Sequence, residues 1–158
     1  ALLSRCTITR HGNFSVFFDR QVRSGRNGLW AEIDVRGQPV AIMNVHLETH
    51  QPAAQVEALL NRIARTSRPL IVMGDFNLAP DDAAMAPLAR TLTDTCRAAA
   101  TRDSREVEAI GTLAAARRRI DHIFVAGPGI HVREAGLLPP THRGISDHIG
   151  YYADVEVG

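Results

Sequence analysis

The 158 residues suit a single domain with a substantial hydrophobic core. Hydrophobic residues make up 45% of the sequence and charged residues 22%, which excludes a disordered chain. The formal net charge of +1 argues against a broad electrostatic footprint for nucleic acid, although a local patch can still bind it. Cys6 and Cys96 are too few for a disulfide framework, and we expect free thiols. No apolar run approaches the length of a membrane span and no signal peptide is visible, which slightly favours a cytoplasmic protein.

The first part of the chain is expected to alternate short strands with polar loops. Ala1–Ser4 and Ser15–Asp19 are apolar enough for strands, whereas Arg5–Asn13 is polar and loop-like. Arg20–Asn27 is rich in arginine and contains a glycine. It is either a solvated loop, which we favour because charged loops are ordinary surface, or an arm that contacts phosphate.

A hairpin is predicted next. Leu29–Val35 alternates apolar and polar residues, with Trp30 on the polar face, where we expect it to pack between layers. Val40–Leu47 is the returning strand. One face of that strand changes from apolar to polar toward its C-terminal end, through Val40, Ile42, Asn44 and His46.

A strand–helix–strand unit follows the hairpin. Pro52 suits the first turn of a helix, and the continuous apolar run Leu70–Met73 is typical of a strand covered on both faces. Such units are nearly always right-handed crossovers between parallel strands of one sheet. His46 and Asp75 therefore end neighbouring strands at the same edge, where open α/β sheets place their sites.

The second half of the chain has weaker patterns. Asp81 and Asp82 open a short helix, and we favour capping over metal binding for them. Thr95–Ala116 has no clear period and is expected to be a mobile excursion. Three further strands are predicted over Ile120–Val125, Ile130–Leu138 and Tyr151–Val157.

Four short stretches place ionisable side chains beside strand ends. In the first two the polar residue ends a strand, and in the last two it lies near the start of one. Antiparallel pairing of the later strands with the earlier ones would bring all four groups to one edge of a mixed sheet. The stretches are Asn44-Val45-His46-Leu47, Gly74-Asp75-Phe76-Asn77, Arg119-Ile120-Asp121-His122 and Ser146-Asp147-His148.

These stretches, in this order, resemble the C-terminal motifs of the endonuclease/exonuclease/phosphatase superfamily. The resemblance covers Ala1 to Val157 and implies an α/β fold, a mixed β-sheet with covering helices that is part of a two-sheet, four-layer, deoxyribonuclease-like sandwich. We expect residues 1–158 to form one such domain, as one sheet and its helices. In that family an upstream half supplies an Asn and a metal-binding Glu, so we expect a domain that lacks its N-terminal part.

The resemblance also implies phosphoester hydrolysis assisted by Mg²⁺ or Mn²⁺, with Asp147 contributing a carboxylate to the metal site. Asp75 would orient or deprotonate the attacking water, and Asn77 would hold a phosphate oxygen. His148 would be the base or a phosphate-stabilising cation. His46 would bind the phosphoryl oxygen from the other side.

Asp121 is assigned to orienting His148, because the adjacent Asp147 projects the opposite way in an extended chain. The alternative for Asp121 is a strand-end cap or a salt bridge with Arg119. We expect His122 to be a packed histidine. His142 and Arg143 are expected to be solvated loop residues, although they could touch substrate.

Two functions therefore follow from the sequence. The first is a metal-dependent phosphoesterase acting on a phosphodiester or phosphomonoester, with nucleic acid, phospholipid and other phosphorylated molecules all possible substrates. The alternative is a non-catalytic phosphate-binding or interaction module that keeps the scaffold without a complete metal site. A nucleophilic serine hydrolase is set aside because no Gly-x-Ser-x-Gly elbow is present. The sequence does not indicate an oligomeric state.

Overall fold

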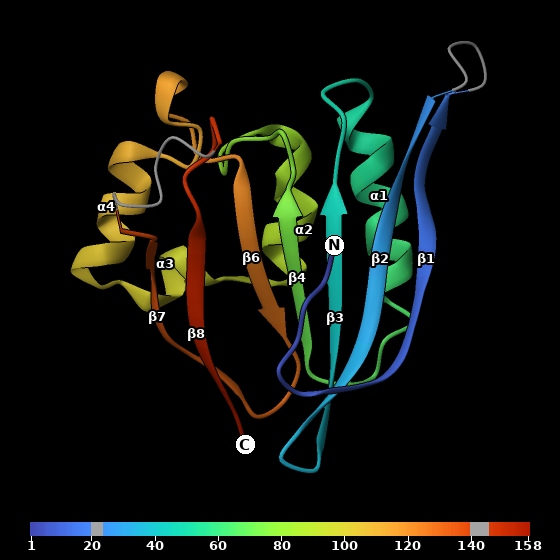
Figure 1. Ribbon diagram of the computed structural model, residues 1–158. Coiled ribbons are helices and arrows are strands. Elements are labelled where there is room, and N and C mark those ends of the chain that lie inside the picture. Colours follow the sequence, from blue (N-terminus) through green and yellow to red (C-terminus); the bar gives the residue numbers. More distant parts are fainter. Residues whose placement is uncertain (20–23, 140–145) are drawn as a thin grey trace.

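The structure, a computed structural model, describes residues 1–19, 24–139 and 146–158 (Figure 1). Arg20, Arg23, His142 and Arg143, which the sequence analysis considered as possible substrate contacts, lie outside these ranges. Within them the chain is a mixed α/β fold of a six-stranded sheet and a two-stranded sheet. The expected fold class is confirmed.

The larger sheet has the strand order β1-β2-β3-β4-β6-β5. Strands β1, β2 and β3 form an antiparallel meander, β3 and β4 are parallel, and β6 is antiparallel to both β4 and β5. The strands are β1 (Thr7–Asp19), β2 (Ser24–Val35), β3 (Gln38–His46), β4 (Leu70–Asp75), β5 (Thr93–Asp94) and β6 (Asp121–Ala126).

The first strands differ from the sequence-based prediction. Ala1–Ser4 is not a strand, and most of the expected loop Arg5–Asn13 belongs to β1. β1 lies at the edge of the sheet and pairs with β2 along most of its length, so backbone pairing explains it better than an apolar pattern does. The residues Gly25 to Asn27 of the expected basic loop likewise belong to β2.

The predicted crossover is confirmed. Helix α1 (Pro52–Ile63) connects β3 to β4, and the backbone N–H of Leu47 donates to the carbonyl of Asp75 at 2.8 Å. The turn into the helix is held by the buried amide of Gln55, which donates to the carbonyls of Glu48 and His50. These contacts hold the ends of β3 and β4 side by side.

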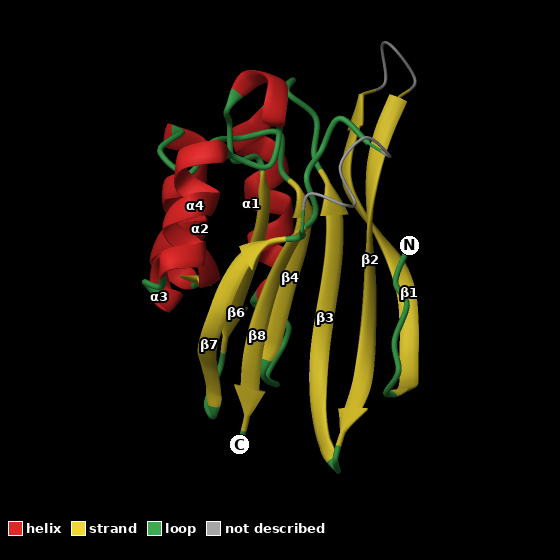
Figure 2. Ribbon diagram, turned by 60° about the vertical axis from the view of Figure 1, so that its left-hand side comes forward, coloured by secondary structure: helices red, strands yellow, loops and turns green. Residues whose placement is uncertain are grey.

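The main core lies between the six-stranded sheet and the helices that gather on one side of it (Figure 2). α1, the 3-10 helix η1 (Ala83–Met85) and α2 (Ala86–Thr91) contribute to it, and Trp30 packs against it as expected. Asp82 accepts a hydrogen bond from the backbone of Ala84 at 2.9 Å, so this aspartate is a helix cap. The largest fully buried side chains of this core include Phe76, Met43, Leu47, Leu59 and Leu88.

The prediction of an excursion without regular structure over Thr95–Ala116 is wrong. The segment forms α3 (Thr95–Ala99), α4 (Arg102–Ile110) and the 3-10 helix η2 (Ala114–Ala116). Asp94 and Thr101 cap α3 and α4 through their side-chain oxygens. The buried guanidinium of Arg119 joins Asp94 and Glu108 at 2.6 and 3.0 Å. Caps and an ion pair stabilise helices too short for a periodic apolar pattern to reveal.

The smaller sheet consists of β7 (Ile130–Leu137) and β8 (Tyr151–Val157), paired antiparallel. α3 and α4 pack against β7. The chain therefore forms two sheets, where the sequence analysis expected it to form one. Among the residues that the structure describes, no helix has the length and apolar character needed to cross a membrane.

Candidate active site

The ends of β3 and β4 bring His46 and Asp75 together. The two residues are register partners in the parallel ladder, and the arrowheads of both strands lie at the same end of the sheet, where β6 begins (Figure 1). The Nε2 atom of His46 lies 3.3 Å from Oδ2 of Asp75. The side chain of His46 is 54% exposed and that of Asp75 only 18%, so the histidine lies at the open side of the pair.

Gly74 is required by this close approach of the strands. Its φ of +138° lies outside the range that L side chains adopt, and a Cβ atom would lie 1.9 Å from the carbonyl oxygen of Val45. Any other residue would push the end of β4 away from β3. Gly74 thus allows Asp75 to lie beside His46.

Asn77 continues the turn in a left-handed conformation, with φ +53°. Its backbone N–H donates to Oδ1 of Asp75 at 2.8 Å, and its side-chain Nδ2 donates to the carbonyl of Leu47 at 2.8 Å. In this structure the amide that is predicted to hold a phosphate oxygen therefore ties the end of β4 to the end of β3. Any hydrogen bond to phosphate would use the second N–H of this amide, whose Nδ2 now lies 3.5 Å from Oδ2 of Asp75.

Asp121 and His148 form the second pair. Asp121 begins β6 directly opposite Asp75, and its Oδ2 lies 2.7 Å from Nδ1 of His148. Ligand atoms of Asp75, Asp121 and His148 all lie within 4.8 Å of one another. Burial lowers the pKa of His148, but the hydrogen bond and charge of Asp121 and the charge of Asp75 outweigh it, so the pKa lies above its ordinary value.

Thr112 holds this second pair in place. Its hydroxyl accepts hydrogen bonds from the backbone N–H groups of Ile120 and Asp121, at 3.1 and 3.0 Å. Its carbonyl accepts from the N–H of Ile149 at 2.7 Å. The side chain is fully buried. The sequence analysis missed Thr112, because a lone threonine in a stretch without periodicity carries no signal of such a role.

Asp147 lies apart from the three-residue cluster. It is exposed, and its Oδ1 lies 3.4 Å from the hydroxyl of Ser146. Among the described residues it has no closer polar partner. Its side chain can therefore take up a cation at the cost of no more than this contact with Ser146. Its assignment as the metal ligand stays a prediction.

The residues present fit a hard divalent cation. Asp75 and Asp121 supply carboxylates at one sheet edge, the exposed Asp147 directly precedes His148 in the chain, and Mg²⁺ usually takes one or two protein carboxylates and keeps several waters. The carboxylates of Asp75 and Asp121 already accept hydrogen bonds or face imidazoles. The donor set is therefore sparse and rich in oxygen, as such ions require.

His122 is packed beneath the site, as expected. It is 1% exposed, its Nε2 lies 2.9 Å from the carbonyl of Leu78, and its Nδ1 lies 3.2 Å from Nη1 of Arg119. A neutral ring with the proton on Nε2 satisfies both contacts. Burial and the charge of Arg119 lower the pKa of His122 to about 4. Arg119, the expected alternative partner of Asp121, pairs with Asp94 and Glu108 instead.

The buried His122 makes stability depend on pH. In the unfolded chain its pKa is 6.5, whereas in the fold it is about 4, so below neutral pH the unfolded state binds the proton first. We expect His122 alone to remove about 3 kcal/mol of unfolding free energy as the pH falls from neutral through this window. Urea unfolding at a series of pH values measures the effect.

His122→Gln is the control for this prediction, since the carboxamide offers one donor and one acceptor but does not titrate. Its unfolding free energy should decline less steeply with falling pH than that of the unchanged protein, whatever its absolute stability. Equal slopes in the two proteins would show that His122 does not carry the effect.

Comparison with known proteins identifies the family of the chain. Residues 1–148 match the model of the Endonuclease/Exonuclease/phosphatase family. No curated protein sequence matches the chain. A solved family protein from Leptotrichia buccalis is 25% identical, with a TM-score of 0.75 over 97% of this chain and 63% of its own.

Two more distant structures share the fold. A mannosyl-6-phosphatase from Bacteroides thetaiotaomicron is 19% identical, with a TM-score of 0.74 over 94% of this chain and 66% of its own. TDP2 of D. rerio, solved with a single-stranded DNA product, is 22% identical, with a TM-score of 0.74 over 96% of this chain and 68% of its own. The chain thus spans about two thirds of the length of these structures. By its family match over residues 1–148, the chain belongs to the endonuclease/exonuclease/phosphatase family.

Proposed function

We propose that the protein hydrolyses a phosphoester bond with the help of Mg²⁺ or Mn²⁺. The observation that supports this most is the meeting, at one sheet edge, of two strand ends and the start of an antiparallel strand. That edge carries Asp75, Asp121 and His148 with ligand atoms within 4.8 Å of one another. These groups come from three segments that are far apart in the sequence. Residues that served only as local turn or cap residues would have no reason to meet at one place.

The Asp121–His148 pair would act on the proton of the attacking water or on the charge of the phosphoryl group. Asp121 holds Nδ1 of the ring, which leaves Nε2 to face the substrate. Burial lowers the pKa of His148, but the hydrogen bond and charge of Asp121 outweigh it and raise the pKa above its ordinary value. Such an imidazole can accept a proton from water or donate hydrogen bonds to phosphate oxygens.

Asp75 would orient the attacking water, with His46 on its open side. Oδ1 of Asp75 is held by the backbone of Asn77, so the carboxylate has a defined direction. His46 lies 3.3 Å from Oδ2 and is exposed enough to reach a phosphoryl oxygen. Asn77 would position Asp75 and could still offer one N–H to phosphate.

Asp147, one residue before His148, is the proposed protein ligand of the cation. The ion would supply a Lewis acid that neutralises charge developing on the phosphoryl oxygens. The substrate is a phosphodiester or a phosphomonoester, and a nucleic acid is one of the possible classes. Solved structures of this fold include a protein named as a sugar phosphatase and one bound to DNA, so the fold does not select between them.

A panel of phosphodiesters and phosphomonoesters, assayed with Mn²⁺, with Mg²⁺ and with a chelator, tests the proposal. We expect turnover of at least one substrate with metal and background rates after chelation. Saturating Mn²⁺ should also stabilise the fold by about 2 kcal/mol or more, seen as a higher melting temperature.

Asp147→Asn should lose most of this stabilisation by Mn²⁺, whereas Asp154→Asn, at an exposed aspartate of β8, should keep it. An equal rise in both variants would remove Asp147 from the metal site. Absence of both turnover and metal response, together with binding of phosphate, would instead favour the non-catalytic phosphate-binding module.

A further inference from the structure

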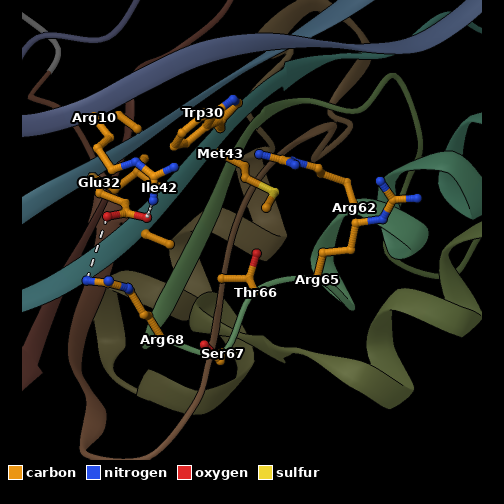
Figure 3. Close-up of a pocket in the computed structure, with 12 residues that line it drawn as sticks. Arg10, Trp30, Glu32, Ile42, Met43, Arg62, Arg65, Thr66, Ser67 and Arg68 are labelled. Carbon is orange, nitrogen blue, oxygen red and sulfur yellow. Dashed lines mark hydrogen bonds and ion pairs between the residues drawn. The ribbon is translucent and has the colours of Figure 1, made fainter.

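A basic pocket lies on the helix-covered side of the six-stranded sheet, away from the candidate active site. It has a volume of about 400 Å³ and lies between the C-terminal end of α1 and the middle of β2 and β3 (Figure 3). Arg68 lines it and lies two residues before β4, whereas Asp75 ends that strand. At ~3.3 Å per residue, roughly 20 Å of extended chain separates the two.

Positive charge dominates the pocket. Arg10, Arg62, Arg65 and Arg68 line it, and Glu32 is the one acidic residue among its lining residues. Glu32 lies 3.3 Å from Arg10 and 3.7 Å from Arg68, so a single carboxylate is shared between two guanidinium groups (Figure 3). A concave surface with such an excess of one charge focuses its field on the space inside.

Arg62 is held by aromatic rings and not by a carboxylate. Its guanidinium carbon lies 5.1 Å from the centre of the Trp30 ring and 5.6 Å from that of Phe14. Arg62 forms no ion pair with any residue the structure describes, and its buried Nε has no hydrogen-bond partner among them. A partly buried cation with an unused donor is costly unless an anion or an acceptor joins it.

We propose that this pocket binds a small phosphorylated molecule or inorganic phosphate, separately from the candidate active site. Arg62 is the central contact, pre-positioned by Trp30. Arg65 and Arg68 follow the C-terminal end of α1 and line the same pocket, and the hydroxyls of Thr66 and Ser67 between them can add donors. Guanidinium groups match the geometry of phosphate oxygens and bind them by paired hydrogen bonds.

A small ligand fits these features better than a nucleic-acid strand. The arginines line one pocket of about 400 Å³, whereas a strand would need positive charge spread along a path. A base of a nucleic acid would also need an uncovered aromatic ring to stack on. Here Arg62 and Arg10 lie over the ring of Trp30, at 5.1 and 5.7 Å from its centre.

Trp30 provides the test, because it is the one tryptophan of the sequence and part of the pocket. Its fluorescence is titrated with inorganic phosphate and with glucose 6-phosphate, in a chelator that suppresses metal-dependent binding at the active site. Sodium chloride at equal ionic strength is the control. We expect a saturable change with at least one phosphate compound and none with chloride.

Arg62→Gln should weaken the binding by about tenfold or more, since it removes a charged donor. The double variant Arg65→Gln/Arg68→Gln, at two exposed side chains, should weaken it as well without disturbing the Trp30 contact. Arg90→Gln, the same change at an exposed position of α2, should bind like the unchanged protein. Asp75→Asn should also bind normally, which separates this pocket from the proposed catalytic function.

The proposal would be overturned by a response to chloride equal to that of phosphate, by unchanged affinity in Arg62→Gln and the double variant, or by no saturable change in the unchanged protein. Tighter binding of single-stranded oligothymidylate than of either phosphate compound, lost in the same variants, would also overturn it, in favour of a nucleic-acid surface.

Discussion

Replacement of His148 by Ala should lower kcat/KM by about a thousandfold or more, because it removes the proposed proton-transfer group at the reacting phosphorus. Asp121→Ala should cost nearly as much. The carboxylate lies 2.7 Å from Nδ1 of His148 and holds the ring in one tautomer and direction. Steady-state rates of each variant with Mn²⁺, on the best substrate of the panel, measure both effects.

A double-variant cycle shows whether Asp121 acts through His148. If it does, Asp121→Ala should change the rate little once His148 is already Ala, because groups that act as a unit are strongly non-additive. Asp103→Asn, at an exposed aspartate of α4, is the matched control and should keep the full rate. Additive losses in the double variant would show that Asp121 contributes independently of the imidazole.

Asp75→Asn should lower kcat by about a hundred- to ten-thousandfold with a smaller change in KM. The amide oxygen can still accept the hydrogen bond from the backbone of Asn77, so the turn keeps its shape. What the variant loses is the negative charge beside His46 and the ability to take a proton from water. Rates and melting temperatures of the two proteins measure the change.

A matched comparison uses His46→Gln, on the exposed side of the same pair. It should cost less than Asp75→Asn, because the histidine is expected to bind substrate and not to activate water. A rate close to normal in folded Asp75→Asn would remove Asp75 from the mechanism.

Residue patterns were sufficient to predict a strand wherever its two faces are buried in a regular way. The continuous run Leu70–Met73 predicts β4 because Leu70 and Val72 face the helices while Ile71 and Met73 pack on the other face. The crossover then places His46 beside Asp75, and antiparallel β6 places Asp121 opposite Asp75. These inferences depend on the geometry of a sheet, which local sequence largely determines.

Patterns failed where contacts distant in sequence carry the structure. β1 pairs along an edge, so its first residues, Thr7–Asn13, show no alternation that would indicate a strand. α3 and α4 depend on Arg119, which reaches back to Asp94. The motif was enough to identify Asn77 as a site residue. Its hydrogen bond to the carbonyl of Leu47 could not be predicted, because that bond crosses between the ends of two strands.

The arrangement around Thr112 has a consequence for how this site tolerates change. The buried hydroxyl and the carbonyl of Thr112 accept hydrogen bonds from main-chain N–H groups of the two chain segments that carry Asp121 and His148. The separation of the acid and the imidazole is therefore independent of which side chains fill the surrounding interior. Neighbouring positions can diversify while this spacing is retained.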